Sequence, residues 1–308
     1  MYHPNPLHGI KASRPATDYD EALCRLAALQ AATTEPLNPL CQTALLTHNA
    51  PTAEVVVMLH GFTNCPHQFH QFAPLLHAQG KNVLLVRLPF HGHEDRLSNG
   101  LAALTVTALI DCLTEALDIA CGLGREVCVI GFSLGGSLAG WAAQKRLDLA
   151  SAILISPAIG IRAIPAQRRW LIGNLFTLLP NLFRWWNPAL KDQRIGPLHA
   201  YPRFATRAVA ALLRLGLVIV AAAEQRAPLA RTIMVITNPS DEVVDNEVTN
   251  AVVKSWRAHG AQVVTHTMPA EWNLLHDFFD PAQEEQQVAR VYPLLLGWIN
   301  EVAVQTTN

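Results

Sequence analysis

A serine flanked by glycines is the part of the sequence best suited to chemistry. Residues 128–140 are CVIGFSLGGSLAG, so Ser133 lies between Gly131 and Gly135 in a Gly-x-Ser-x-Gly motif. An apolar run precedes it and small apolar residues follow it, which predicts a sharp turn from a strand into a helix. The helix N-terminus would place its positive end under the serine. The motif predicts that Ser133 is a nucleophile; the alternative is a glycine-rich turn without chemistry.

A serine nucleophile needs a histidine base. For a serine in this strand-to-helix motif, the expected order along the chain is serine, acid, histidine. Four histidines follow Ser133. His199 lies in an aromatic-rich segment, and His259 precedes a glycine at a predicted helix end. His266 falls inside a predicted strand and is the second choice. His276 follows the last predicted strand, at the edge where ligands bind, and is the predicted base.

The base in turn needs a carboxylate to orient it. Asp241 is the first carboxylate after the apolar run at 232–237 and is the predicted acid. Asp245 precedes a helical pattern and is predicted to be the N-cap. Asp277 adjoins His276 and would face away from it in a helix, so it is a poor orienter.

An acyl-transfer site also needs donors for the oxyanion. The sequence His60-Gly61-Phe62 ends the first strong apolar run, where such donors are expected. The backbone N–H groups of Phe62 and Leu134 are the predicted oxyanion hole. His60 is expected to pack and hydrogen-bond beneath the loop without a catalytic role.

The elements that must position these residues are visible as apolar runs. Six runs carry the expected strands, at residues 54–59, 82–88, 126–132, 151–156, 232–237 and 261–268. Helical patterns alternate with them, which predicts an α/β fold with a mostly parallel, doubly wound sheet and helices on both faces. Residues 43–48 are expected to add an antiparallel strand.

No strand signal is found between Pro157 and about residue 228. This interval predicts a helical cap at 157–228, inserted into a core domain formed by residues 1–156 and 229–308. Five cap aromatics are predicted to line the acyl pocket over the serine, namely Trp170, Phe176, Phe183, Trp185 and Trp186. A pocket for an acyl chain needs such apolar walls.

Five motifs together, HGF, LPFHGH, GFSLGG, SDEVV and LLH, resemble the α/β-hydrolase fold family over residues 42–305. The first two are most similar to those of bacterial carboxylesterases and monoacylglycerol-lipase-like hydrolases. The resemblance implies an eight-stranded sheet and a metal-independent Ser133-His276-Asp241 mechanism that cleaves carboxylic esters of short- to medium-chain acyl groups. A thioesterase or a serine peptidase would use the same machinery. A non-catalytic binding protein on the same scaffold is the rival from another class.

Composition narrows the partners. A formal net charge of −1 offers no basic surface, so no nucleic-acid partner is expected. The N-terminal stretch lacks an apolar signal core, and Arg214 interrupts the apolar run at 208–223, so we expect a cytoplasmic protein without membrane contact. The expected partner is a small-molecule ester. The sequence does not indicate an oligomeric state.

Two residue types could suggest metal or redox chemistry. The HGHED stretch at 91–95 lies in one loop without a complementary ligand group, so no metal and no cofactor are expected. The six cysteines contain no CxxC and are expected to be reduced thiols, with Cys112, Cys121 and Cys128 in the core. Cys41 and Cys65 flank a strand and could approach each other, but a bond between them is not expected.

Overall fold

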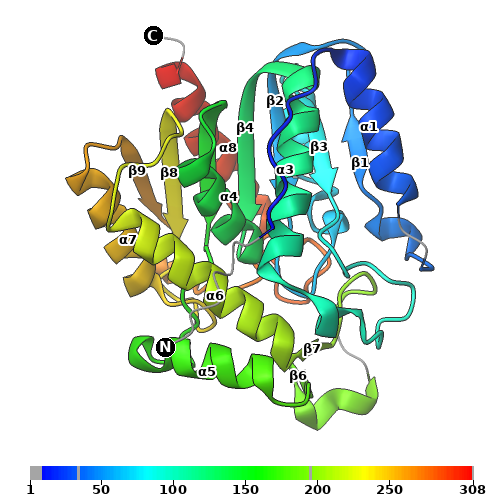
Figure 1. Cartoon of the computed structure of the whole chain (residues 1–308), viewed down its shortest axis with the longest axis vertical. Coiled ribbons are helices and arrows are strands. Elements are labelled where there is room, and N and C mark those ends of the chain that lie inside the picture. The colour runs from blue at the N-terminus through cyan, green and yellow to red at the C-terminus, as the bar shows by residue number, and fades with distance from the viewer. Residues whose placement is uncertain (1–8, 33–34, 194–195, 307–308) are drawn as a thin grey trace.

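A seven-stranded sheet runs through the molecule in the order β1-β3-β2-β4-β5-β8-β9 (Figure 1). The computed structural model describes residues 9–32, 35–193 and 196–306, so residues 1–8 of the expected core domain lie outside the described residues. The strands of the sheet are β1 (Ala44–Leu46), β2 (Thr52–Leu59), β3 (Asn82–Val86), β4 (Gly124–Phe132), β5 (Leu149–Ile155), β8 (Thr232–Thr237) and β9 (Val263–Thr267).

Every strand pair in this sheet is parallel except β1 with β3, which is antiparallel. The expected mostly parallel, doubly wound sheet and its antiparallel first strand are therefore confirmed. The expectation of an eight-stranded sheet is wrong for the described residues, whose main sheet has seven strands. The chain passes from β2 to β3 on one side and then crosses to β4 on the other. Such a switch in strand order opens a crevice at the carboxyl ends of β2 and β4.

Helices cover both faces of the sheet. They are α1 (Tyr19–Ala31), α2 (Ala73–His77), α3 (Val106–Leu123), α4 (Leu134–Lys145), α5 (Ala166–Leu178), α6 (Thr206–Ala223), α7 (Asn246–Ala258) and α8 (Val288–Thr306). Short 3₁₀ helices lie at Pro39–Cys41, Pro66–Phe69, Gly100–Ala103, Pro188–Gln193 and Ala270–Trp272. Helices α3, α4 and α7 pack on one face, and α2 and α8 pack on the other (Figure 1).

Strand β2 shows why the sheet sequences are continuously apolar. Val55 and Val57 belong to the hydrophobic cluster under α3 and α4, whereas Val56 and Met58 belong to the cluster under α2 and α8. Successive side chains of a strand point to opposite faces, and here both faces are buried. Full burial of one such side chain contributes about 1.5–3 kcal/mol, so the two-sided core fixes the strand register.

The segment 157–228 lies between β5 and β8 and contains more than helices. Besides α5 and α6 it forms a two-stranded antiparallel sheet of β6 (Phe183–Trp185) and β7 (Arg203–Ala205). The expectation of no strand here is wrong, because three-residue strands are too short to show an alternating pattern. Helix α6 also packs on the core, where the Gln144 side chain donates to the Ile219 carbonyl at 3.0 Å. The division into core and cap stays a prediction.

Helix α6 is, within the described ranges, the one helix long and apolar enough to cross a membrane. In the fold 61% of that stretch is buried against the rest of the chain. A buried core helix has the same composition, so this feature gives weak evidence for a membrane span.

The cysteines differ from expectation at one pair. Cys41 and Cys65 form a disulfide, with Cα atoms 5.3 Å apart. The expectation of reduced thiols is therefore wrong for these two, because the fold brings the 3₁₀ helix that ends at Cys41 against the one that Cys65 precedes. A disulfide is unusual in a reducing compartment, which counts against the expected cytoplasmic location. That location stays a prediction.

We expect reduction of this disulfide to lower the free energy of unfolding by about 3 kcal/mol, since it closes a loop with a sequence separation of 24. Urea unfolding with and without a reductant measures the change. The Cys41→Ser/Cys65→Ser variant is the control and should not respond to the reductant. Equal stability of the oxidised and reduced wild type would show that the bond does not constrain the unfolded chain.

Candidate active site

Ser133 occupies a strained turn between β4 and α4. Its backbone has φ 55° and ψ −112°, a region that costs a residue with a side chain about 1–3 kcal/mol. The Ser133 N–H donates to the Ile155 carbonyl at 2.9 Å. A side chain at Gly131 would overlap the backbone of Gly135, and one at Gly135 would overlap the carbonyl of Leu59. The motif glycines therefore allow strand and helix to meet at the serine.

His276 and Asp241 complete a hydrogen-bonded chain with this serine. The distance from His276 Nε2 to Ser133 Oγ is 2.8 Å, and that from His276 Nδ1 to Asp241 Oδ2 is 2.6 Å. Because an ionised carboxylate can only accept, the Nδ1 atom carries the proton. The Nε2 atom is then free to accept the hydroxyl proton of Ser133. The arrangement can activate a serine for attack on a carbonyl.

The Asp241 carboxylate is buried and held in its ionised form. Burial alone would raise its pKa, but the hydrogen bond and electrostatic attraction of His276 and the amides of Val244 and Val243 outweigh burial. Both amides donate to Oδ1, at 3.0 and 2.9 Å. The pKa of Asp241 therefore lies below its ordinary value. An ionised partner can stabilise the imidazolium that forms when His276 takes a proton.

Asn238 joins the acid loop to the histidine loop, a role that the sequence analysis missed. Its side-chain amide donates to the Leu274 carbonyl at 2.9 Å, and its backbone carbonyl accepts from the Asn246 side chain at 2.7 Å. The sequence marks the Asn-Pro pair only as the start of a loop. Which later loop the amide contacts depends on the β8–β9 pairing.

The loop after β2 is held from below by His60, which is fully buried. The Leu88 N–H donates to His60 Nε2 at 3.1 Å, so His60 Nδ1 carries the proton and donates to the Gly61 carbonyl at 2.9 Å. The predicted role of His60 in packing and hydrogen bonding is confirmed. Because a trans peptide points its C=O and N–H in opposite directions, this bond also directs the Phe62 N–H away from His60.

The two predicted oxyanion donors lie at neighbouring strand ends. Phe62 follows β2, and Leu134 begins α4 directly after Ser133. Among the described residues neither amide donates a hydrogen bond within the chain. Both amides are thus available to a substrate, and their assignment as an oxyanion hole stays a prediction.

The rejected candidates have other partners. The His266 ring stacks on Trp298 with centroids 4.4 Å apart, and His259 ends α7. Asp245 is the N-cap of α7, as predicted: its Oδ1 accepts from Glu247 N at 3.1 Å. His199 is buried against Asp280, at 2.8 Å.

The five cap aromatics lie in different surroundings. Trp170 and Phe176 belong to α5, and Trp185 belongs to β6. The Phe183 ring is covered by the Arg203 guanidinium, 4.3 Å from the ring centroid. Whether these four line a pocket stays a prediction.

Trp186 is joined to the loop that carries Phe62. Its indole N–H donates to Thr63 Oγ1 at 3.0 Å, and its ring lies 6.3 Å from that of Phe62 in a T-shaped pair. The Thr63 carbonyl also accepts from the Tyr201 N–H at 2.7 Å. The segment 157–228 therefore touches the candidate site through Thr63.

Comparison with known proteins gives the family. A family model described as the alpha/beta hydrolase family matches residues 56–291, so the chain belongs to the α/β hydrolases. A curated relative, the thermostable monoacylglycerol lipase of Bacillus sp. (strain H-257), is 29% identical over 113 residues. That match spans 36% of this chain and 43% of the relative. The chain is thus an α/β hydrolase with distant similarity to lipases and esterases.

Solved structures support the same fold. The structure of the Paleococcus ferrophilus monoacylglycerol lipase has a TM-score of 0.61 and 17% identity, covering 85% of this chain and 99% of its own. The soluble variant of the Saccharomyces cerevisiae monoglyceride lipase, in complex with a substrate analogue, has a TM-score of 0.63 and 12% identity, covering 90% and 98%. The structure of Est1E from Butyrivibrio proteoclasticus, which has ferulic acid bound, has a TM-score of 0.54 and 16% identity, covering 85% and 95%. At this identity the likeness establishes the fold alone.

We expect Asp241→Asn to lower kcat by about 10⁴-fold, because the amide favours the wrong histidine tautomer. Asp245→Asn is the matched control: asparagine caps a helix as well as aspartate does, so most of kcat should remain. Ester hydrolysis kinetics measure both. A large loss of kcat in Asp245→Asn, with kcat retained in Asp241→Asn, would reverse the assignment of the acid.

We expect the free energy of unfolding to fall as the pH is lowered from 7 to 5. Burial lowers the pKa of His60 well below its usual value and that of His91 to about 4, so the unfolded chain binds protons that the folded chain does not. Each contributes up to about 1.4 kcal/mol per pH unit below the unfolded pKa near 6.5. Burial and Asp280 raise the pKa of Asp277 to about 6, which offsets one histidine below that pH. Urea unfolding at several pH values measures this, and stability that rises toward pH 5 would contradict it.

Proposed function

We propose that the chain is a serine hydrolase that cleaves carboxylic esters of short- to medium-chain acyl groups through an acyl-enzyme. The observation that carries this is the hydrogen-bonded order Asp241, His276, Ser133 at the carboxyl edge of the sheet. Family membership supports hydrolysis, and the relative and solved structures named above support an ester or lipid-ester substrate as the first to test.

The proposed reaction has two half-reactions, and His276 acts first as a base and then as an acid in each. Ser133 Oγ attacks the ester carbonyl while His276 Nε2 takes its proton and then gives it to the leaving alcohol. The Asp241 carboxylate stabilises the imidazolium, and the amides of Phe62 and Leu134 donate to the oxyanion. Water, deprotonated by His276 Nε2, then attacks the carbonyl of the acyl-enzyme; its bond to Ser133 breaks, His276 returns the proton to Ser133 Oγ, and the carboxylic acid leaves. The mechanism needs no metal, so a chelator should leave the rate unchanged.

Three alternatives share part of this description. A thioesterase or a serine peptidase would use the same groups on another acyl compound. A non-catalytic binding protein would keep the scaffold without turnover, but such a protein has no need of a histidine hydrogen-bonded to both Ser133 and Asp241. The order of these groups therefore favours an enzyme.

We expect hydrolysis of p-nitrophenyl esters by the wild type and a loss of about 10⁴-fold or more in Ser133→Ala, with unchanged thermal unfolding. The serine hydroxyl carries chemistry and little packing, so the fold should tolerate its loss. Parallel assays with thioesters and peptide amides rank the alternatives. Wild type without turnover on any of the three classes would sink the proposal.

The chain-length preference is proposed to depend on the aromatic residues of the segment 157–228, with Trp186 the strongest candidate. We expect Trp186→Ala to change the ratio of kcat/KM between short and medium acyl chains, because each buried methylene is worth about 0.8 kcal/mol. Trp186→Phe keeps an apolar ring but loses the indole N–H, so it should retain most of the preference. A panel of esters with increasing chain length measures both. An unchanged profile in Trp186→Ala would place the acyl chain elsewhere.

A further inference from the structure

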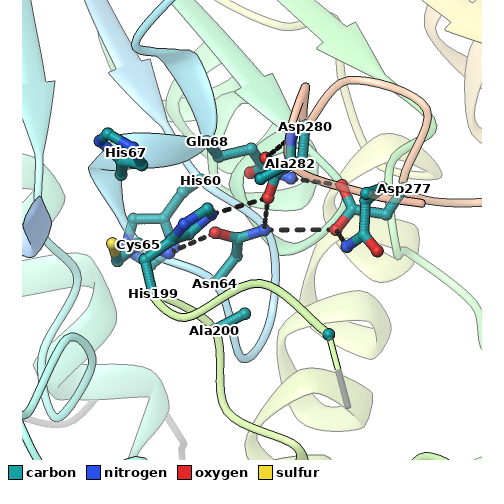
Figure 2. Close-up of polar contacts among 12 residues, drawn as sticks. His60, Asn64, Cys65, His67, Gln68, His199, Ala200, Asp277, Asp280 and Ala282 are labelled. Carbon is teal, nitrogen blue, oxygen red and sulfur yellow. Dashed lines mark hydrogen bonds and ion pairs between the residues drawn. The ribbon is translucent and has the colours of Figure 1, made fainter. Parts of the chain in front are cut away.

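A network of buried and half-buried amide and carboxylate side chains lies beside the candidate site. Gln68 and Asn64 come from the loop after β2, Asp277 and Asp280 come from the loop after β9, and His199 comes from the segment 157–228 (Figure 2). Gln68 and Asp280 are fully buried, and Asn64 is 2% exposed. The proposed catalytic chain uses none of these residues.

Gln68 connects the β2 loop to the residue that follows the candidate base. Its Oε1 accepts from the Gly61 N–H at 2.9 Å, and its Nε2 donates to Asp277 Oδ1 at 2.6 Å. A backbone N–H can only donate, and an ionised carboxylate can only accept. The orientation of the Gln68 amide is therefore fixed from both ends.

Asp277 is an acceptor for three side-chain donors. Besides Gln68, the Asn64 side chain donates to Oδ2 at 3.2 Å and the Gln283 side chain donates to Oδ2 at 2.7 Å. Burial and the nearby Asp280 carboxylate raise the pKa of Asp277 to about 6. Above that pH the ionised carboxylate matches its donors. Because Asp277 follows His276 directly, the network links the loops of the base and of the Phe62 amide.

The Asn64 side chain is also held by Asp280, which in turn contacts His199. The Asn64 side chain donates to Asp280 Oδ2 at 2.9 Å, and His199 Nε2 lies 2.8 Å from the same oxygen. The Cys65 N–H donates to Asn64 Oδ1 at 2.8 Å, which fixes the orientation of this second amide. The network thus has one defined direction for every amide in it.

The peptide between His60 and Gly61 is clamped at both ends. Its N–H donates to Gln68, and its carbonyl accepts from the Gly135 N–H at 3.2 Å. The next peptide carries the Phe62 N–H. His60 Nδ1 and the Asn64 N–H donate to the carbonyl of this next peptide, at 2.9 and 3.2 Å. Because glycine restricts rotation about its own Cα least, the direction of the Phe62 N–H depends on these two bonds together with the clamp on the preceding peptide.

We propose that Gln68 and Asp277 are positioning residues for the oxyanion loop: a hydrogen-bond relay from Gly61 through Gln68 to Asp277 fixes the His60–Gly61 peptide and, together with the His60 bond to the Gly61 carbonyl, sets the direction of the Phe62 N–H. The inference rests on the proposed function for its catalytic consequence. It gives Asp277 a role that is separate from orienting His276. It also explains why a neutral amide is buried beside Gly61, where an apolar side chain would leave the Gly61 N–H without an acceptor.

The direction of the hydrogen bond between positions 68 and 277 can be reversed by exchanging the amide and the carboxylate between them. In Asp277→Asn, the new side chain has one oxygen and one NH₂ group. If the NH₂ group faces Gln68 Nε2, two donors meet. If the oxygen faces Gln68, the NH₂ group faces the donors of Asn64 and Gln283. In Gln68→Glu, a carboxylate oxygen faces the Asp277 carboxylate. Each single variant therefore contains one mismatched contact, whichever way the amide turns.

The double variant Gln68→Glu/Asp277→Asn restores every contact. The carboxylate introduced at position 68 accepts from the Gly61 N–H and from the new amide at position 277, whose oxygen still accepts from Asn64 and Gln283. The number of carboxylates is unchanged. A relay that acts through the matching of donors to acceptors therefore predicts rescue, and a role of the wild-type side chains in packing does not.

The test is ester hydrolysis at pH 8 for the wild type, the two single variants and the double variant. We expect each single variant to lower kcat by about tenfold or more with KM within about twofold, since an oxyanion donor acts in the transition state. The double variant should recover to within about threefold of the wild type. Gln283→Ala is the matched control: it removes a donor to Asp277 outside the relay and should keep the wild-type kcat.

Hydrogen exchange of residues 60–64 gives a readout that needs no activity. The single variants should exchange the Gly61 amide faster, and the double variant should restore its protection. Single variants with wild-type kcat and protection, or a double variant no better than the worse single variant, would overturn the inference. A wild type that hydrolyses no ester would instead overturn the proposed function, and amide exchange would then decide the relay by itself.

Discussion

The backbone conformation of Ser133 is the constraint on which the rest of the candidate site depends. A positive φ at a serine is unfavourable, and the surrounding elements hold it in place through several backbone bonds. Its N–H donates to Ile155 of β5, and its carbonyl accepts from the Ser137 and Ala158 N–H groups at 3.0 Å each. The turn therefore exists because β4, β5 and α4 are already packed together. It lifts the hydroxyl to the sheet edge, where the loops after β8 and β9 can reach it.

The polar groups around this turn form two directional chains. One passes from Ser133 through His276 to Asp241, where two amides complete the shell of the carboxylate. The other passes from Gly61 through Gln68 to Asp277. Both end on a carboxylate, because an acceptor-only group is what fixes the direction of every donor before it. Neighbouring residues of one loop, His276 and Asp277, therefore serve different loops.

Sequence alone could predict the positions that follow a long apolar run. Ser133, Asp241 and His276 come after β4, β8 and β9, and parallel strands deliver their carboxyl ends to one edge. The strands themselves were predictable because both of their faces are buried, as in β2 and β4. Local sequence patterns also predicted the antiparallel first strand and the helix N-cap at Asp245.

Features made by long-range contact could not be predicted in this way. The strands β6 and β7 are three residues long and have no periodicity to detect. The Cys41–Cys65 bond depends on how two short 3₁₀ helices pack, which their spacing does not indicate. Gln68 and Asn64 are neutral amides in the connection after β2, and their carboxylate partners are more than 200 residues away.

The central claim is that Ser133 is the activated nucleophile of this fold, and covalent labelling tests it most directly. The protein is treated with a fluorophosphonate, and the modified residue is mapped by peptide mass spectrometry. The account predicts one adduct at Ser133, formed far more slowly in His276→Ala, because the base that activates the hydroxyl is then missing. Absence of the Ser133 adduct in the wild type, or an equal rate without His276, would contradict it.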